Sequence, residues 1–185
     1  MKTRLDLYNN SWYDPGGGRL KRLLWYFINH LIFNHGLLPI NGLKISILRL
    51  FGGKIGKGVV LKPSVNIKYP WRLSIGDYAW IGEGVWIDNL GQVEIGAHAC
   101  LSQGCLLISG NHNYRSEKFD LLVGDIALEE GVWIGTKAVV CGGVRAGSHA
   151  VLSAGSVASS NLDAWMIYRG NPAVPVRKRE INGNY

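Results

Sequence analysis

The sequence predicts an all-β protein, a solenoid of hexapeptide repeats, and three observations support this fold class. Glycine is unusually frequent, with 25 glycines among 185 residues, and it shows no collagen-like period. Aliphatic residues, many of them followed by glycine, set a register that repeats every six residues. Four positions after most of these aliphatic anchors there is a second, small or branched residue.

The anchors fall into four runs. These are Ile55, Leu61, Ile67 and Leu73; Ile75, Ile81, Ile87 and Val93; Ile95, Leu101 and Leu107; and Leu128, Ile134, Val140, Ala146, Leu152 and Ala158. The second residues are Val59, Val65, Ala79, Val85, Ala99, Cys105, Val132, Ala138, Val144, Ala150 and Ser156. The register slips between runs, which predicts loops that bulge at a corner at 69–74 and 89–94.

A period of six fits neither a helix nor an ordinary amphipathic strand, but it fits three short strands per coil of a prism. Each anchor would point inward, the second residue would pack near a corner, and glycine would give the corner its backbone freedom. Coils of about 18 residues, stacked about 4.8 Å apart, make a prism on the order of 25 Å tall. A β-sandwich rich in Ile-Gly turns is the competing interpretation, and the number of anchors in phase argues against it.

Residues 19–51 leave the six-residue register and show helical spacing. The apolar positions are Leu20, Leu23, Leu24, Phe27, Ile28, Leu31 and Ile32, followed by Leu43, Ile45, Ile47, Leu48 and Leu50. Asn34-His35-Gly36 and Pro39 separate two helices, and the second ends near Gly52-Gly53. We expect these helices to cover the open edge of the first coil.

A second interpretation adds a membrane-facing surface to the same segment. Aromatic and basic side chains of the kind that suit an anionic membrane are Trp12, Trp25 and Tyr26 with Arg19, Lys21, Arg22, Lys44 and Arg49. Both interpretations can hold together, and peripheral contact with an anionic membrane is therefore kept open.

The charge of the chain differs between its regions. There are 20 Lys and Arg against 13 Asp and Glu, a net charge of +7. Residues 1–58 hold nine basic and two acidic groups, residues 59–168 seven and ten, and residues 169–185 four and one. A neutral-to-acidic middle argues against nucleic-acid binding, which needs a basic stripe over the folded face. It predicts anionic partners at the two ends.

Composition limits the class and the compartment. A hydrophobic content of 47% excludes a disordered chain. The longest apolar stretch, residues 23–33, is too short to cross a membrane. The first ten residues show no apolar segment of a secretory signal, and the three cysteines are sparse. We expect a cytoplasmic protein, with the inner face of the membrane as a peripheral location.

Of the five histidines, His112 is the candidate general base. It lies in the polar segment 109–115, where the third run stops and an excursion from the scaffold begins. Histidine changes protonation near neutral pH, as a general base must. His98 and His149 occupy corner positions, and His30 and His35 belong to the helical segment, so we expect structural roles for these four.

The cysteines and the possible metal ligands give weaker indications of function. Cys100, Cys105 and Cys141 are expected to be small buried hydrophobic residues rather than nucleophiles. No metal motif is present. The γ-class carbonic anhydrases use a β-helix with three zinc-binding histidines across a subunit interface, and His98 and His149 with His112 are kept as that alternative.

The motifs together resemble the left-handed parallel β-helix acyltransferases. The His112 loop, Gly131–Gly135 and Arg169-Gly-Asn-Pro-Ala173 are similar to the galactoside, maltose and xenobiotic O-acetyltransferases. The closest resemblance is to the colanic acid biosynthesis acetyltransferase family, through segments 50–56, 62–65, 69–73 and 76–80. The resemblance runs from about Leu48 to Arg177. It also supplies the left-handedness, because parallel crossovers are otherwise right-handed.

This resemblance implies a homotrimer that holds acetyl-CoA in a groove between neighbouring prisms and needs no metal. His112 would take a proton from a sugar hydroxyl while the oxygen attacks the thioester directly. The implied acceptor-binding residues are Asn89, Asn111 and Tyr114. The implied cofactor-binding residues are Trp133, Gly135, Thr136, Ala154, Arg169, Arg177 and Lys178. The acceptor would be a small-molecule or lipid-linked saccharide of exopolysaccharide or cell-surface glycan biosynthesis, and no nucleic-acid partner is expected.

The expected organisation has three parts: a helical segment at 1–53, the β-helix at 54–163 with a loop at 109–127, and an irregular C-terminal tail at 164–185. One departure concerns residues 158–164, where the family has a lysine and a proline that this chain lacks. Glu117 and Asp120 are the loop candidates for orienting His112. The alternatives are a non-catalytic β-helix scaffold or binding protein, and a zinc enzyme like the γ-class carbonic anhydrases.

Overall fold

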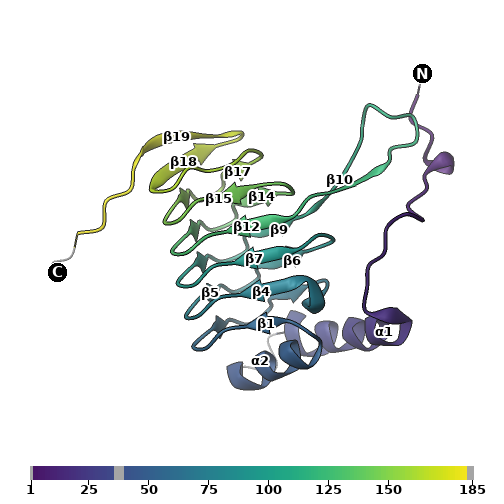
Figure 1. Ribbon diagram of the computed structural model, residues 1–185, viewed down its shortest axis with the longest axis horizontal. Helices are drawn as coiled ribbons and strands as arrows, with labels where there is room; N and C mark the ends of the chain where they lie inside the picture. The colour runs from purple at the N-terminus through teal and green to yellow at the C-terminus, as the bar shows by residue number, and fades with distance from the viewer. Residues whose placement is uncertain (1, 36–39, 183–185) are drawn as a thin grey trace.

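The computed structural model describes residues 2–35 and 40–182. Its strands wind into a β-solenoid, a three-faced prism whose coils stack along one axis (Figure 1). Five coils each contribute one strand to each of three parallel sheets. The predicted fold class is confirmed.

Each face has a strand order that follows the coils. The first face contains β1 (Lys54–Ile55), β4 (Leu73–Ile75), β7 (Val93–Ile95), β12 (Ile126–Leu128) and β15 (Arg145–Ala146). The second contains β2 (Val60–Leu61), β5 (Trp80–Ile81), β8 (Cys100–Leu101), β13 (Trp133–Ile134), β16 (Val151–Leu152), β18 (Met166–Gly170) and β19 (Ala173–Lys178). The third contains β3 (Asn66–Ile67), β6 (Trp86–Asp88), β9 (Leu106–Ile108), β14 (Val139–Cys141) and β17 (Val157–Ala158).

The core is the interior of the prism. Every anchor and every second residue named from the sequence is buried, with exposed fractions of 8% or less. Anchors of successive coils pair directly, as Leu101 does with Ile81 and Ile134. The six-residue register therefore identifies the inward side chains correctly.

Two of the histidines, His98 and His149, lie at corners of the prism. His98 and His149 have positive φ angles of 56° and 61°, which places them in the left-handed turns of their corners. Their rings pack on aromatic side chains of neighbouring corners, His98 on Tyr78 and His149 on Trp165. The expected corner positions are confirmed.

The excursion from the third coil is more regular than a loop. β10 (Gly110–His112) and β11 (Leu121–Val123) form an antiparallel hairpin that stands away from the prism (Figure 1). The backbone N–H of Gly124 donates to the carbonyl of Ser109 at 2.9 Å, so the chain returns to the corner from which it left.

The C-terminal segment is not the irregular tail that the sequence suggested. β18 pairs in parallel with β16, and β19 turns back antiparallel to β18, so both extend the second face. Tyr168 and Ala173 are buried there. The physical reason is that the last coil would otherwise leave an unpaired sheet edge, which the two strands cover.

The N-terminal segment forms the expected helices. After a 3-10 turn, η1 (Leu5–Leu7), α1 (Gly18–Ile28) continues into a π-helical stretch, η2 (Asn29–Asn34), and α2 (Asn41–Leu50) follows. A further 3-10 turn, η3 (Pro70–Arg72), forms the first predicted corner loop. Gly36 and Pro39, predicted to separate the helices, lie outside the described residues.

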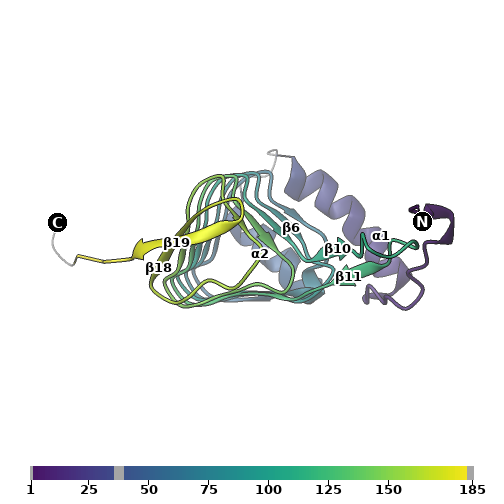
Figure 2. The ribbon, with the colours of Figure 1, turned by 90° about the horizontal axis from the view of Figure 1, so that it is seen from above.

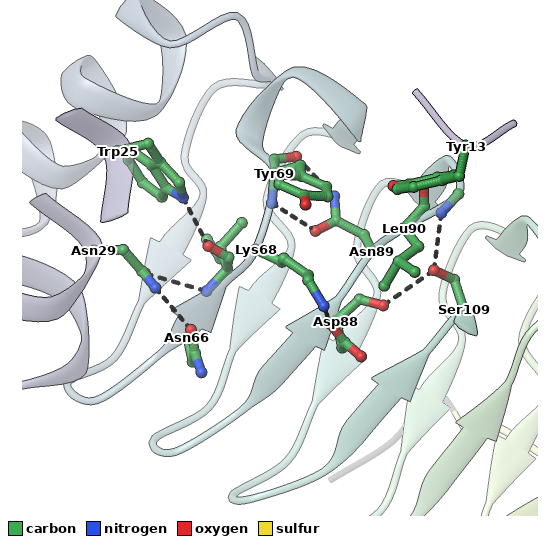
Figure 3. A network of polar contacts seen from close by, with 12 residues as sticks. Tyr13, Trp25, Asn29, Asn66, Lys68, Tyr69, Asp88, Asn89, Leu90 and Ser109 are labelled. Carbon is green, nitrogen blue, oxygen red and sulfur yellow. Dashed lines mark hydrogen bonds and ion pairs between the residues drawn. The ribbon is translucent and has the colours of Figure 1, made fainter. Parts of the chain in front are cut away.

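Both helices lie at the end of the prism where the first coil begins (Figure 1). Figure 2 shows α2 beneath the interior of the prism and α1 beside it. Trp25 donates its indole N–H to the Ile67 carbonyl at 2.8 Å, and Asn29 donates to the Asn66 side chain (Figure 3). The cap expected over the first coil is present.

The membrane-facing set suggested by the sequence needs correction. Trp25 is only 2% exposed. Lys44 is equally buried and donates to the carbonyls of Leu61 and Lys62. Arg49 donates to the carbonyls of residues 55 and 56. These three side chains donate hydrogen bonds to the first coil, because the carbonyls at its open edge require donors. Across the described ranges, none of the helices is both long and apolar enough to span a bilayer.

Candidate active site

His112 ends β10 and faces across the hairpin towards the turn that follows. Its ring Nδ1 lies 2.9 Å from the carbonyl oxygen of Phe119. A carbonyl can only accept, so this hydrogen bond requires the proton on Nδ1 and leaves Nε2 as an acceptor. The Phe119 ring stacks on the imidazole, with centroids 4.4 Å apart and planes 7° from parallel. The backbone of the hairpin and the Phe119 ring therefore fix the orientation of the imidazole.

The orienting group differs from both sequence candidates. Asp120 accepts from the Ser116 hydroxyl at 2.6 Å, and the Glu117 carbonyl accepts from the backbone of Arg4. The orienting atom is instead the main-chain oxygen of Phe119, a residue with a positive φ of 54°. Every residue has a main-chain carbonyl, so the sequence does not indicate which carbonyl orients His112.

An N-terminal segment of the chain passes alongside the hairpin. The sequence contains no indication of this contact. The ring of Tyr8 lies 5.7 Å from that of His112. Further along, the Tyr13 hydroxyl donates to the Leu90 carbonyl at 2.9 Å, and burial raises the pKa of Tyr13 to about 12. This segment therefore places an aromatic ring next to the imidazole.

The three residues expected at the acceptor are placed differently. Asn111 is exposed next to the base, and its side-chain oxygen accepts from the backbone N–H of His112. Tyr114 is 74% exposed near the hairpin tip.

Asn89 is not exposed, and its expected contact with an acceptor is corrected. Its side chain is fully buried, and its amide both donates to and accepts from the backbone of Tyr69 at 2.7 and 2.9 Å (Figure 3). The bulging corner at 89–94 breaks the regular ladder there, and the amide replaces the missing backbone partner.

The cofactor residues expected from the sequence do come together. A groove of about 300 Å³ on the second face is lined by Trp133, Gly135, Thr136, Ala154, Arg169 and Arg177. Ile167 and Val176, which the sequence did not suggest, complete its apolar wall. Lys178 lies in an adjoining hollow of about 260 Å³ with Arg177 and Arg179. The groove thus has apolar side chains along its length and basic side chains at one end.

Gly135 has a structural reason to be glycine as well. A Cβ there would lie 2.5 Å from the backbone nitrogen of Ala154 and 2.8 Å from the carbonyl oxygen of Leu152. The coils could not stack with a larger residue at this position.

Of the three cysteines expected to be buried, Cys105 is buried, whereas Cys100 and Cys141 are partly exposed. Burial raises the pKa of the Cys105 thiol to about 12, and it also raises the pKa values of Cys100 and Cys141. High thiol pKa values leave little thiolate near neutral pH. Among residues 2–35 and 40–182, no three His, Cys, Asp or Glu side chains are grouped closely enough to hold a metal ion.

The three faces carry different outward side chains. The first face aligns Lys54, Ser74, Glu94, Ala127 and Arg145, and Arg145 pairs with Glu129 at 2.5 Å. The second face aligns Val60, Trp80, Cys100, Trp133, Val151 and Ile167. The third aligns Asn66, Trp86, Leu106, Val139 and Val157. One face is charged and two are largely apolar, although their tryptophans are about half exposed.

The hairpin that carries His112 and the groove lie on opposite sides of one chain. Figure 2, a view along the prism, shows the β10–β11 hairpin and the β18–β19 strands leaving in opposite directions. Figure 1 shows the same separation from the side. A single copy cannot bring His112 to its own groove.

A hexapeptide prism with a histidine-bearing hairpin and a cationic groove defines the class of the hexapeptide-repeat acyltransferases. No protein-family model matches the chain. It is 41% identical over 164 residues to the "Putative colanic acid biosynthesis acetyltransferase WcaF" of Escherichia coli (strain K12), which covers 89% of this chain and 90% of that protein. The chain belongs to the hexapeptide-repeat acetyltransferase family of that protein and is an acetyltransferase.

Solved structures show the same fold. A maltose O-acetyltransferase from Clostridium difficile 630 superposes with a TM-score of 0.80 at 20% identity, covering 88% of both chains. A hexapeptide-repeat acetyltransferase from Vibrio cholerae, solved with acetyl coenzyme A, gives a TM-score of 0.78 at 22% identity over 88% of both chains.

Proposed function

We propose that this chain is an acetyl-CoA-dependent O-acetyltransferase that acts on a sugar hydroxyl in exopolysaccharide or cell-surface glycan biosynthesis. The observation that carries the proposal is the hydrogen bond from His112 Nδ1 to the Phe119 carbonyl, because it leaves Nε2 to act as a base. A non-catalytic scaffold would have no need of an imidazole held in one tautomer.

The chemistry is a direct transfer. Nε2 of His112 accepts the hydroxyl proton as the sugar oxygen forms a bond to the thioester carbonyl carbon. The tetrahedral intermediate then collapses, and the carbon–sulfur bond breaks. The imidazolium returns its proton to the departing sulfur, so the products are an acetyl ester and the free thiol of CoA. A base of this kind contributes roughly 10²–10⁴-fold.

Acetyl-CoA would lie in the groove on the second face. Trp133, Ile167 and Val176 would contact its apolar arm. Arg177 and Lys178 would meet its phosphates, because cationic side chains make charge-assisted hydrogen bonds to phosphate oxygens. The Vibrio cholerae relative of the same fold was solved with acetyl coenzyme A, which supports this assignment.

A homotrimer would complete the site. The base of one copy must meet the groove of another, since they lie on opposite sides of a single chain. The apolar second and third faces supply two surfaces that can pack against each other around a threefold axis, while the charged first face stays in water.

The acceptor would be a saccharide, free or lipid-linked, and a lipid-linked acceptor would place the protein at the inner face of a membrane. The reacting sugar would lie at His112, and a hollow of about 410 Å³ between α1 and the third face, which His112 does not line, would hold further units of a longer saccharide. Aromatic rings of Tyr26, Tyr69 and Trp86 line it beside the polar groups of Asn29 and Lys68. Such a mixture of flat apolar rings and hydrogen-bonding groups suits a sugar.

The first experiment compares two histidine variants. We expect His112→Asn to lower turnover at least about a hundredfold, because asparagine cannot take up the proton. The His98→Asn control, at a corner that tolerates asparagine in a left-handed turn, should keep near-normal turnover. Both should bind CoA as the unchanged protein does, measured by the thermal shift that CoA produces. Near-normal turnover of His112→Asn would overturn the base assignment, and no thermal shift with acetyl-CoA would favour a scaffold.

The second experiment tests whether copies share the site. Ala154→Trp should fill the groove and abolish CoA binding, and it should be inactive alone, as should His112→Asn. Co-expressed, the two variants should regain part of the activity, because some interfaces then combine an intact base with an intact groove. Mixtures that stay inactive, although mass analysis shows mixed trimers, would contradict a shared site.

A further inference from the structure

We propose that the end of the prism covered by α1 and α2 is a docking face for an anionic membrane. The docking face consists of exposed apolar side chains of the two helices together with exposed basic side chains around them. The apolar members are Leu20, Leu23, Leu24, Phe27, Leu31, Leu43 and Leu50.

The apolar part begins with α1 and its continuation η2, whose exposed apolar stripe is offset from the side packed on the prism. One side packs on the prism through Trp25, Phe33 and the half-buried Ile28. The other side carries Leu20, which is 69% exposed, and four further residues at helical spacing, ending at Leu31. Because the packed side fixes the helix, this outer stripe cannot turn inward.

α2 adds to the same end of the molecule. Its inner side buries Ile45 and Leu48 against the first coil, and its outer side carries Leu43 and Leu50, the latter 81% exposed. Figure 1 shows both helices at the end of the prism opposite the C-terminal strands. Exposed large apolar side chains gathered at one end of a molecule are typical of an interaction site.

The charge around these residues points to an anionic partner. From Pro15 to Gly76 the chain has no Asp or Glu and ten Lys or Arg. Lys21, Lys44 and Arg49 are occupied by contacts within the protein. Arg19 and Lys54 are exposed, and so is Lys57, although its ammonium group lies 3.9 Å from the Asp77 carboxylate and over the ring of Tyr78.

The same charge argues against a second copy docking end to end. That contact would bring Arg19, Lys54 and Lys57 of one copy against the same groups of the other, and like charges repel. Anionic lipid headgroups attract such groups, and leucine and phenylalanine side chains enter the boundary between headgroups and acyl chains. In the proposed homotrimer, three such ends face the same side and bind the membrane together. Only this multivalent binding rests on the proposed homotrimer.

The experiment is flotation of the full chain with vesicles of phosphatidylcholine, with and without phosphatidylglycerol. The test variant is Leu20→Gln with Leu23→Gln. The matched control is Leu5→Gln with Ile181→Gln, which removes equally exposed apolar side chains outside the docking face. Turnover on a soluble acceptor and the oligomeric mass are measured for each protein.

We expect the unchanged chain to bind vesicles that contain phosphatidylglycerol and to bind neutral vesicles at least about tenfold more weakly. The test variant should lose at least about tenfold in binding to anionic vesicles while the control keeps it, with turnover and oligomeric mass unchanged in both. Equal flotation of test and control, or no flotation of the unchanged chain, overturns the docking face. A changed oligomeric mass of the test variant also overturns it, because the stripe would then be a contact between subunits. An unchanged chain that binds anionic vesicles but shows no turnover would count against the proposed acetyl transfer instead.

Discussion

The prism and its helical cap both show clear periodicity, but only in the prism does the period identify the buried side. In the prism, all anchors taken from the six-residue register are buried. In α1, the leucines at helical spacing are exposed, and the buried residue is Trp25, which lies off that stripe. A coil has one interior, whereas a helix beside a prism can carry two apolar sides.

The difference shows what kind of packing each region uses. Each coil is held by ladder hydrogen bonds above and below, so register and burial are fixed together. The cap is held by a few specific bonds to edge carbonyls, from Trp25, Lys44 and Arg49. Substitutions that look alike should therefore have unlike effects in the two regions.

The largest expected difference is between two leucine truncations. Leu101→Ala removes a fully buried anchor and should lower the free energy of unfolding by about 2–5 kcal/mol. Leu23→Ala, in the exposed stripe of α1, should change it by no more than about 0.5 kcal/mol. Urea denaturation followed by circular dichroism measures both. Comparable losses would show that the outer stripe of α1 is packed in solution.

Two glycine-to-alanine substitutions should change the free energy of unfolding in opposite directions. A Cβ at Gly96 would lie 2.5 Å from a backbone carbon of Glu129 in the next coil, so Gly96→Ala should destabilise by about 1–3 kcal/mol. Nothing lies within 4 Å of a Cβ at Gly42 in α2, so Gly42→Ala should stabilise by about 0.4–1 kcal/mol. Thermal melts of the two variants test this, and a shift in the same direction for both would contradict it.

The smallest expected effect concerns the pH dependence at Lys44. Burial lowers the pKa of this lysine below its usual value, so its charge costs stability at neutral pH. As the pH rises towards the usual lysine pKa, the folded state loses the proton first, and the cost falls. The stability of the unchanged chain relative to Lys44→Met should therefore rise over that range. A difference that stays constant with pH would show that the ammonium group is well solvated.

Much of the fold could be predicted from the residues because each coil repeats the same local rule. The groove was anticipated through the resemblance to the acetyltransferase family, which pointed to Trp133, Thr136 and Ala154 in the repeats and to Arg169 and Arg177 beyond them. The C-terminal strands could not be predicted in this way, because their pairing depends on the open edge of the last coil rather than on a repeat.

The contacts of the base were harder to predict for a different reason. The Phe119 carbonyl and the Tyr8 ring reach His112 through the hairpin turn and a distant N-terminal segment. Asn89 was misplaced because an asparagine in a corner loop looks the same in sequence whether it meets a ligand or a backbone. Its pairing with Tyr69 becomes visible only when the coils are stacked.

The single hydrogen bond between Gly124 and Ser109 at the base of the hairpin has a consequence for how such proteins can diverge. Because the corner is closed without the hairpin, residues 110–123 can lengthen, shorten or change composition while the ladders above and below stay intact. The groove belongs to those ladders. In the proposed enzyme, the hairpin that carries His112 and the groove for acetyl-CoA would thus lie in separable stretches of chain, and selection could alter one without disturbing the other.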